Sequence, residues 1–88
     1  MEQFIEDVER VLRAERPDVT EDRRRVLAEA VVGMASSESR PEAAAWANRL
    51  WCIGTGRGPF VRPYLDCQGA LQTAKRAGVP VRFRLSQA

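Results

Sequence analysis

The chain has 88 residues, of which 44% are hydrophobic and 30% are charged, and its formal net charge at pH 7 is +2. This length corresponds to one small domain, and no apolar run approaches the roughly 20 residues of a membrane-spanning helix. A basic-then-apolar leader is not recognisable, so we expect a cytoplasmic protein without a membrane partner. The chain contains no histidine, the side chain most used for acid–base catalysis at neutral pH.

The first predicted helix covers residues 2–15. Its apolar side chains recur at helical spacing, with acids near its start and arginines near its end, as the helix dipole favours. A second helix is expected to begin after Thr20, which is suited to an N-cap. Arg23–Arg25 lie early in that helix, against the dipole, and are explained either by ion pairs with acids such as Glu29 or by an anionic ligand. Because the link is short, residues 1–36 predict a helical hairpin.

The central predicted helix covers residues 39–53 and contains both tryptophans. Ser39 and Glu42 have the spacing of a capping box, and the alanines that follow favour a helix. We interpret Trp46 and Trp51 as core anchors. The alternative is that Trp51 is an exposed contact for a partner, because tryptophan and arginine dominate such contacts.

The glycine-rich loop Gly54–Gly58 is expected to end this helix, since glycine permits positive φ angles and a proline follows. One interpretation is a helix end with a flexible turn. The other is an anion-binding nest, in which backbone amides and Arg57 face a phosphate. The loop follows a predicted helix, whereas a phosphate-binding P-loop follows a strand.

Residues 60–85 predict a basic strand–helix–strand segment. Residues 60–65 contain strand-forming side chains and a proline, so they are expected to be an edge strand or irregular. Asp66 is suited to cap a helix over residues 67–77. Apolar and basic side chains alternate over residues 79–85, the period of a half-buried strand.

The predicted fold class is therefore α+β and predominantly α-helical. Three to four short helices are expected to pack with a small C-terminal β-strand or ribbon, formed by residues 60–65 and 79–85. Two strands alone are marginal in water. A homodimer that pairs the C-terminal strands of two chains is therefore one expectation.

The two cysteines, Cys52 and Cys67, are too few for a disulfide framework, and two cysteines alone cannot fill a tetrahedral zinc site within one chain. We interpret them as small half-buried apolar residues, with a disulfide or redox pair as the alternative. A cysteine nucleophile would lack its usual imidazole partner. We therefore expect no enzyme, no cofactor and no metal.

Positive charge is concentrated in the second half of the chain. Residues 1–48 contain seven arginines against eleven acids, a net charge of −4, and residues 49–88 contain seven basic residues against Asp66 alone, a net charge of +6. Either the basic half contacts something anionic, or the two halves pair with each other within the fold. The predicted partner- or anion-binding residues are Trp51, Arg57, Arg62, Lys75, Arg76, Arg82 and Arg84.

The expected function is that of a non-enzymatic protein-interaction module. It would be an adaptor or inhibitor that docks its basic C-terminal half on the acidic surface of a protein or of a nucleic-acid-bound complex. Phage-encoded inhibitors such as anti-CRISPR proteins resemble it in small size and in lack of motifs. The alternative is a small DNA- or RNA-binding protein whose same basic residues contact phosphates, although a net charge of +2 is low for that class.

Overall fold

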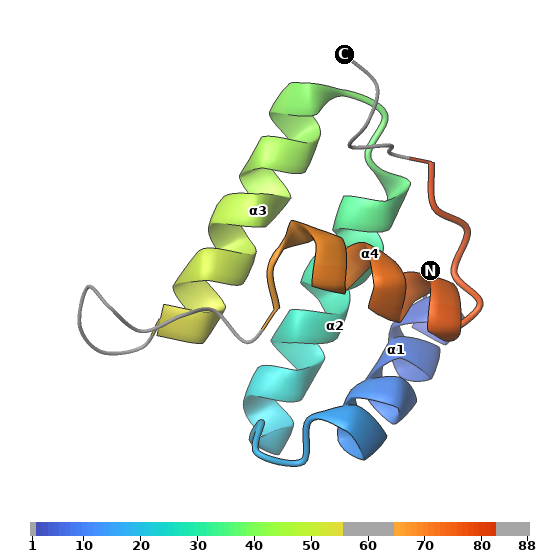
Figure 1. Ribbon diagram of the computed structural model, residues 1–88, viewed down its shortest axis with the longest axis vertical. Helices are drawn as coiled ribbons and strands as arrows, with labels where there is room; N and C mark the ends of the chain where they lie inside the picture. Colours follow the sequence, from blue (N-terminus) through green and yellow to red (C-terminus); the bar gives the residue numbers. More distant parts are fainter. Residues whose placement is uncertain (1, 56–64, 83–88) are drawn as a thin grey trace.

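The structure, a computed structural model, describes residues 2–55 and 65–82, with the backbone alone at residues 53–55. Its helices are α1 (Glu2–Glu15), α2 (Glu21–Ser36), α3 (Arg40–Thr55) and α4 (Cys67–Arg76). Helices α1, α3 and α4 each pack against α2, and α1 also contacts α4. In Figure 1, α4 crosses α2, while α3 stands at one edge of the molecule and runs antiparallel to α2. Helix α2 is therefore the centre of the domain.

The α+β prediction is wrong, because the described part of the chain is a small all-helical domain without a β-strand. Residues 79–82, the described part of the predicted C-terminal strand, form an extended segment against the C-terminal end of α2. The backbone N–H of Arg82 donates to the carbonyl of Ala35 (2.7 Å), and no strand ladder accompanies this bond in the described residues. The remainder of the two predicted strands, residues 60–64 and 83–85, lies outside the described residues.

The alternating pattern that predicted the strand has another cause. Val79 is buried and Val81 half-buried, whereas Pro80 and Arg82 are exposed. An extended chain turns alternate side chains to opposite sides whether or not it belongs to a sheet. The period of two therefore marks a segment that lies with one side on the helices.

Most predicted helix ends are confirmed. The carboxylate of Asp66 accepts a hydrogen bond from the Gly69 amide (2.7 Å) at the start of α4, and the positive φ of Gly78 (81°) follows its end. Helix α3, however, continues to Thr55, so Gly54 does not end it. The end of this helix lies two residues beyond the predicted one because one glycine weakens a helix without stopping it.

The capping box at the start of α3 forms only in part. The Glu42 amide donates to the Ser39 hydroxyl (3.3 Å), as predicted. The Glu42 carboxylate instead accepts from the amide of Glu38 (2.8 Å), one residue before the expected Ser39. The Ser39 side chain thus caps the N-terminus of α3, and the Glu42 side chain bonds to the turn that leads from α2.

Helix α2 is buried on nearly every side over its second half. Its sequence reads as one apolar face, but the structure buries Leu27, Ala28 and every residue of 30–35. Such all-round burial occurs when a helix is covered by neighbours on several sides, here α1, α3 and α4. The largest fully buried apolar side chains of the described core are Val8, Leu12, Val19, Leu27, Val31, Val32 and Met34.

Gly33 sets how closely α3 approaches α2. A Cβ at this position would lie 2.5 Å from the Cδ2 and Cζ2 atoms of Trp46, well inside van der Waals contact. The indole of Trp46 therefore packs directly on the α2 backbone. Trp46 is half-buried, and the guanidinium carbon of Arg49 lies 5.7 Å from the ring centroid, within cation–π range.

Candidate protein-interaction surface

The basic residues predicted to bind an anionic partner are not gathered into one site by the described structure. Arg76 pairs with Glu15 (2.9 and 3.1 Å), and Arg82 pairs with Glu38 (2.8 Å). Lys75 is exposed and makes no ion pair within the described residues. The other three predicted basic residues, Arg57, Arg62 and Arg84, lie outside the described residues.

These two ion pairs agree with the second explanation of the charge asymmetry, in which the acidic and basic halves of the chain pair with each other. Each joins an arginine of the basic half to a glutamate of the acidic half, across 61 residues for Arg76 and 44 for Arg82. Both pairs are largely exposed, and such pairs contribute at most about 1 kcal/mol. Their main effect is to lower the local net charge that a partner would meet.

Of the arginine cluster at the start of α2, Arg25 is explained by ion pairs. Its guanidinium contacts Glu2 (2.6 Å) and Glu9 (2.8 Å) of α1, and Glu29 on its own helix (3.5 Å). Hydrogen bonds to Glu9 and then Glu2 raise the pKa of Arg25 above its ordinary value. This arginine joins α1 to α2 and needs no external anion.

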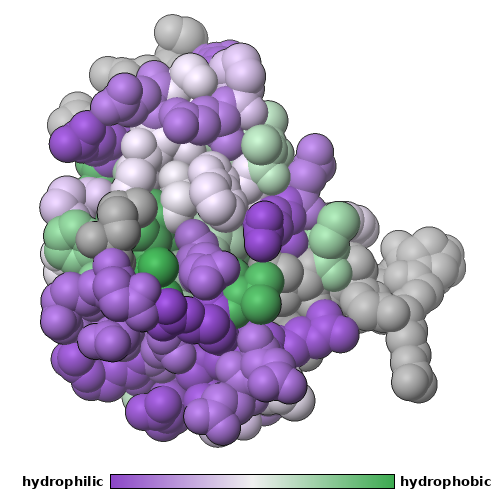
Figure 2. Space-filling view, turned by 180° about the vertical axis from the view of Figure 1, so that it is seen from behind, coloured by the Kyte–Doolittle hydropathy of each residue, from purple (hydrophilic) through white to green (hydrophobic). Residues whose placement is uncertain are grey.

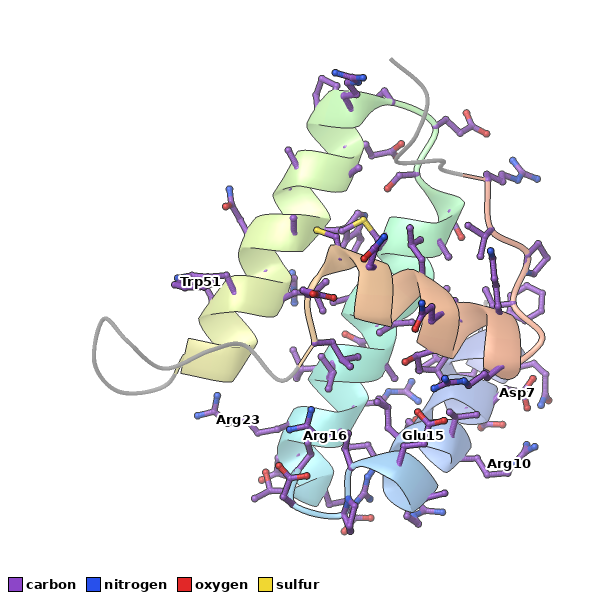
Figure 3. All side chains as sticks on the ribbon, viewed as in Figure 1. Asp7, Arg10, Glu15, Arg16, Arg23 and Trp51 are labelled. Atoms are coloured by element: carbon purple, nitrogen blue, oxygen red, sulfur yellow. The ribbon has the colours of Figure 1, made fainter. Side chains whose placement is uncertain are left out.

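An open depression of about 230 Å³ lies over α1. It is lined by Glu6, Glu9, Arg10 and Arg13, two acids and two bases. Glu9 already accepts from Arg25, and Arg10 pairs with Asp7 (2.7 Å) on the surface shown in Figure 3. Because its two acids and two bases balance in charge, this depression has no preference for either sign of ion.

Among the large hydrophobic residues that the structure describes, Trp51 alone is exposed, with 51% of its surface accessible to solvent. Figure 3 shows it projecting from α3, away from the rest of the molecule. The interpretation as a core anchor is confirmed for Trp46, which packs against the core. It is wrong for Trp51. An exposed indole is a large amphipathic group of the kind that is enriched in binding sites.

The solvent side of α3 carries no charge around Trp51. Residues follow one another at about 100° around a helix, so one set of exposed positions shares the side opposite the buried Ala43 and Leu50. We call this set the α3 outer face; it consists of Pro41, Ala44, Ala45, Asn48, Trp51 and Cys52, all exposed. Arg49, the one charged residue between 43 and 52, lies at its edge beside Trp46.

Apart from Ala14 of α1, the exposed positions of the other helices are polar, charged or both. Figure 2 shows hydrophilic side chains concentrated over the lower part of the molecule, where α1 and the first half of α2 lie. On α4 the exposed positions include Gln68, Gln72, Lys75 and Arg76. The α3 outer face is thus set apart by chemistry as well as by position. The signal that could have found it is the charge-free run at 43–48 next to a second tryptophan.

Both cysteines are free, Cys52 exposed on the α3 outer face and Cys67 half-buried at the start of α4. The disulfide alternative is therefore not what the structure contains. Within the described residues, no group of three or more His, Cys, Asp or Glu side chains is placed to hold a metal ion. None of the described helices combines the length and the apolar character needed to cross a membrane.

No protein-family model, curated protein sequence or solved structure matches this chain. The chemistry of the surface is therefore the basis for assigning a function.

Proposed function

We propose that the protein is a non-enzymatic interaction module, which binds another protein through the α3 outer face with Trp51 as its anchor. The observation that carries this proposal is the 51% exposure of Trp51 on a helix side without charged residues. Removing apolar surface from water contributes roughly 25 cal/mol per Å². An indole left in water is therefore a large unused contribution to binding.

The chemistry of the face indicates an uncharged partner surface. A charged group buried against the alanines and the indole would lose its hydration without gaining an ion pair. A nucleic acid would need several phosphate contacts, since these supply most of its affinity, and the α3 outer face offers none. Arg76 and Arg82 are already paired with glutamates, so they leave little free positive charge for phosphates. Adaptors and inhibitors both use a surface of this kind, and the identity of the partner decides between these roles.

Position-specific photo-cross-linking in cells that express the protein tests the proposal. A photo-reactive phenylalanine analogue is introduced in place of Asn48, at the centre of the α3 outer face, and in a separate protein in place of Gln72 on α4. Both positions are exposed, so the two proteins differ only in the face that carries the probe. We expect protein adducts from position 48, none from position 72, and loss of the former when Trp51→Glu is added.

Three results would contradict the proposal: no adduct from position 48, the same adducts from both positions, or adducts that survive Trp51→Glu. Adducts that disappear on nuclease treatment would instead favour the nucleic-acid alternative. Circular dichroism of Trp51→Glu shows whether the helices remain formed, so that loss of an adduct is not mistaken for unfolding.

A further inference from the structure

Apart from Pro41, the residues of the α3 outer face occupy positions that are symmetric about Asn48. Two small side chains, Ala44 and Ala45, precede it by four and three positions. Two larger ones, Trp51 and Cys52, follow it by three and four positions. Asn48 also lies close to the middle of the exposed side, since positions 44 and 52 are each about 40° from it around the helix.

A two-fold axis through Asn48 makes this face complementary to itself. When two copies of α3 lie antiparallel, a position that follows residue 48 in one copy lies level with the position equally far before residue 48 in the other. The two-fold axis also keeps each position on the same side of the helix pair in both copies. Trp51 of one copy then lies opposite Ala44 of the other, and the two positions are offset by about 1.5 Å along the helix axes. Cys52 lies opposite Ala45 in the same way. Each larger side chain faces a small one, which allows close packing.

We propose that the occupant of the α3 outer face is a second copy of this chain, paired antiparallel through α3 with Asn48 on the two-fold axis. This inference rests on the proposed function and names the partner for it. It moves the homodimer expected from the sequence away from the C-terminal segment, where the described residues hold no strand.

The one polar side chain of the face is satisfied by this arrangement. The amide of Asn48 has both donors and an acceptor, so two amides that meet on the axis can bond to each other. A single asparagine in an apolar helix pair is known to fix register and orientation. Charged groups also lie in favourable places. Arg49 of one copy lies on the same side of the helix pair as Glu42 of the other. The two positions are about 7.5 Å apart along the helix axes, a gap that these two long side chains can bridge.

The pair is expected to be weak. The stretch from 41 to 52 is only about 17 Å long, and the contact of one helix with another is smaller than the roughly 1,600 Å² of a standard protein interface. Self-association should therefore be measured by sedimentation over about 10 µM to 1 mM, the range in which weak contacts of this size are populated. We expect the mass to rise from one chain toward two over this range.

Asn48→Arg tests the face, with Gln72→Arg on α4 as the matched control. The first variant puts two like charges on the axis without partners, and we expect the dissociation constant to rise by about 30-fold or more. The control should leave the dissociation constant unchanged within about twofold, because exposed substitutions of this kind have small effects. A dimer that Asn48→Arg leaves intact would overturn the inference, because the copies would then meet through another face.

A disulfide tests the register. In a Cys52→Ser and Cys67→Ser background, Asn48→Cys places two thiols on the axis, and mild oxidation should give a covalent dimer. The matched protein keeps Cys52 and carries only Cys67→Ser. The Cys52 positions of its two copies would be about 12 Å apart along the helix axes, too far for a disulfide. It should stay largely uncrosslinked. Equal cross-linking of both proteins would overturn the antiparallel register.

The outcomes separate this inference from the proposed function. A purified protein that remains a single chain up to 1 mM, while position 48 still cross-links to a different protein in cells, removes the second copy and leaves the interaction module. If the purified protein does not self-associate and position 48 gives no cross-link in cells, both the dimer and the interaction module are ruled out.

Discussion

Helices α2 and α3 have the same length, 16 residues each, but they belong to the protein in different ways. The alanines Ala28, Ala30 and Ala35 of α2 are fully buried, whereas Ala44 and Ala45 of α3 are exposed. The difference is the number of neighbours: α2 is covered by three helices, and α3 packs mainly on α2. An uncharged helix thus becomes a core element or a candidate binding surface according to how many of its sides the fold covers.

The largest expected effect compares truncation of a buried side chain of α2 with truncation of the exposed indole of α3. Leu27→Ala should lower the free energy of unfolding by about 3 kcal/mol, because it leaves a cavity at a position that is 0% exposed. Trp51→Ala should cost less than about 1 kcal/mol, since much of its side chain is already in water. Urea unfolding of dilute protein measures both. Similar losses for the two variants would show that α3 is integrated as deeply as α2.

The contact that joins the two helices should give the next largest effect. Gly33→Ala should lower stability by about 1–2 kcal/mol, because overlap of the new Cβ with Trp46 exceeds the gain in helix propensity. In a Trp46→Leu background, Gly33→Ala should leave stability unchanged or raise it by up to about 1 kcal/mol relative to Trp46→Leu alone, since alanine is a better helix former than glycine. Thermal unfolding of the four proteins completes the cycle. A stabilising Gly33→Ala in the wild-type background would mean that the indole does not pack on the α2 backbone.

The attachment of α2 to α1 should be weaker and should depend on salt. Arg25→Gln removes the cation that contacts Glu2 and Glu9, so the melting temperature should fall at low salt. The difference from wild type should shrink in 1 M NaCl, where screening is strong. Arg13→Gln, at an exposed position of α1 without an ion pair among the described residues, should change the melting temperature less. A loss at Arg25 that is equal at both salt concentrations would indicate packing in place of charge.

The smallest effect is expected in the link between α1 and α2. A hydrogen bond from Arg16 lowers the pKa of Asp18 below its ordinary value of 3.8. A carboxyl group with a lowered pKa in the folded state contributes stability above its unfolded pKa and loses it as pH falls through the folded value. Asp18→Asn should therefore destabilise the protein slightly at pH 7 and less so at pH 2. Melting curves at both pH values measure this, and a difference that is as large at pH 2 as at pH 7 would contradict it.

The helices were largely predictable from the sequence, and the candidate site was not. The bounds of α1, the start of α2 and both ends of α4 follow from caps, glycines and apolar spacing. Trp51 was among the predicted contact residues, but as part of a basic surface that the described residues do not assemble. Arg76 and Arg82 instead bind Glu15 and Glu38, which are far away in sequence.

Where the helices begin can be read from local sequence, because a cap such as Asp66 acts on an amide only three residues away. The sequence also determines that the middle of α3 has little charge. Three features depend on packing between distant segments: residues 79–82 lie on helices, α2 is covered on several sides, and the uncharged side of α3 faces water. Burial is a property of long-range packing, and the same apolar pattern is compatible with a covered or an open face until the neighbouring helices are in place.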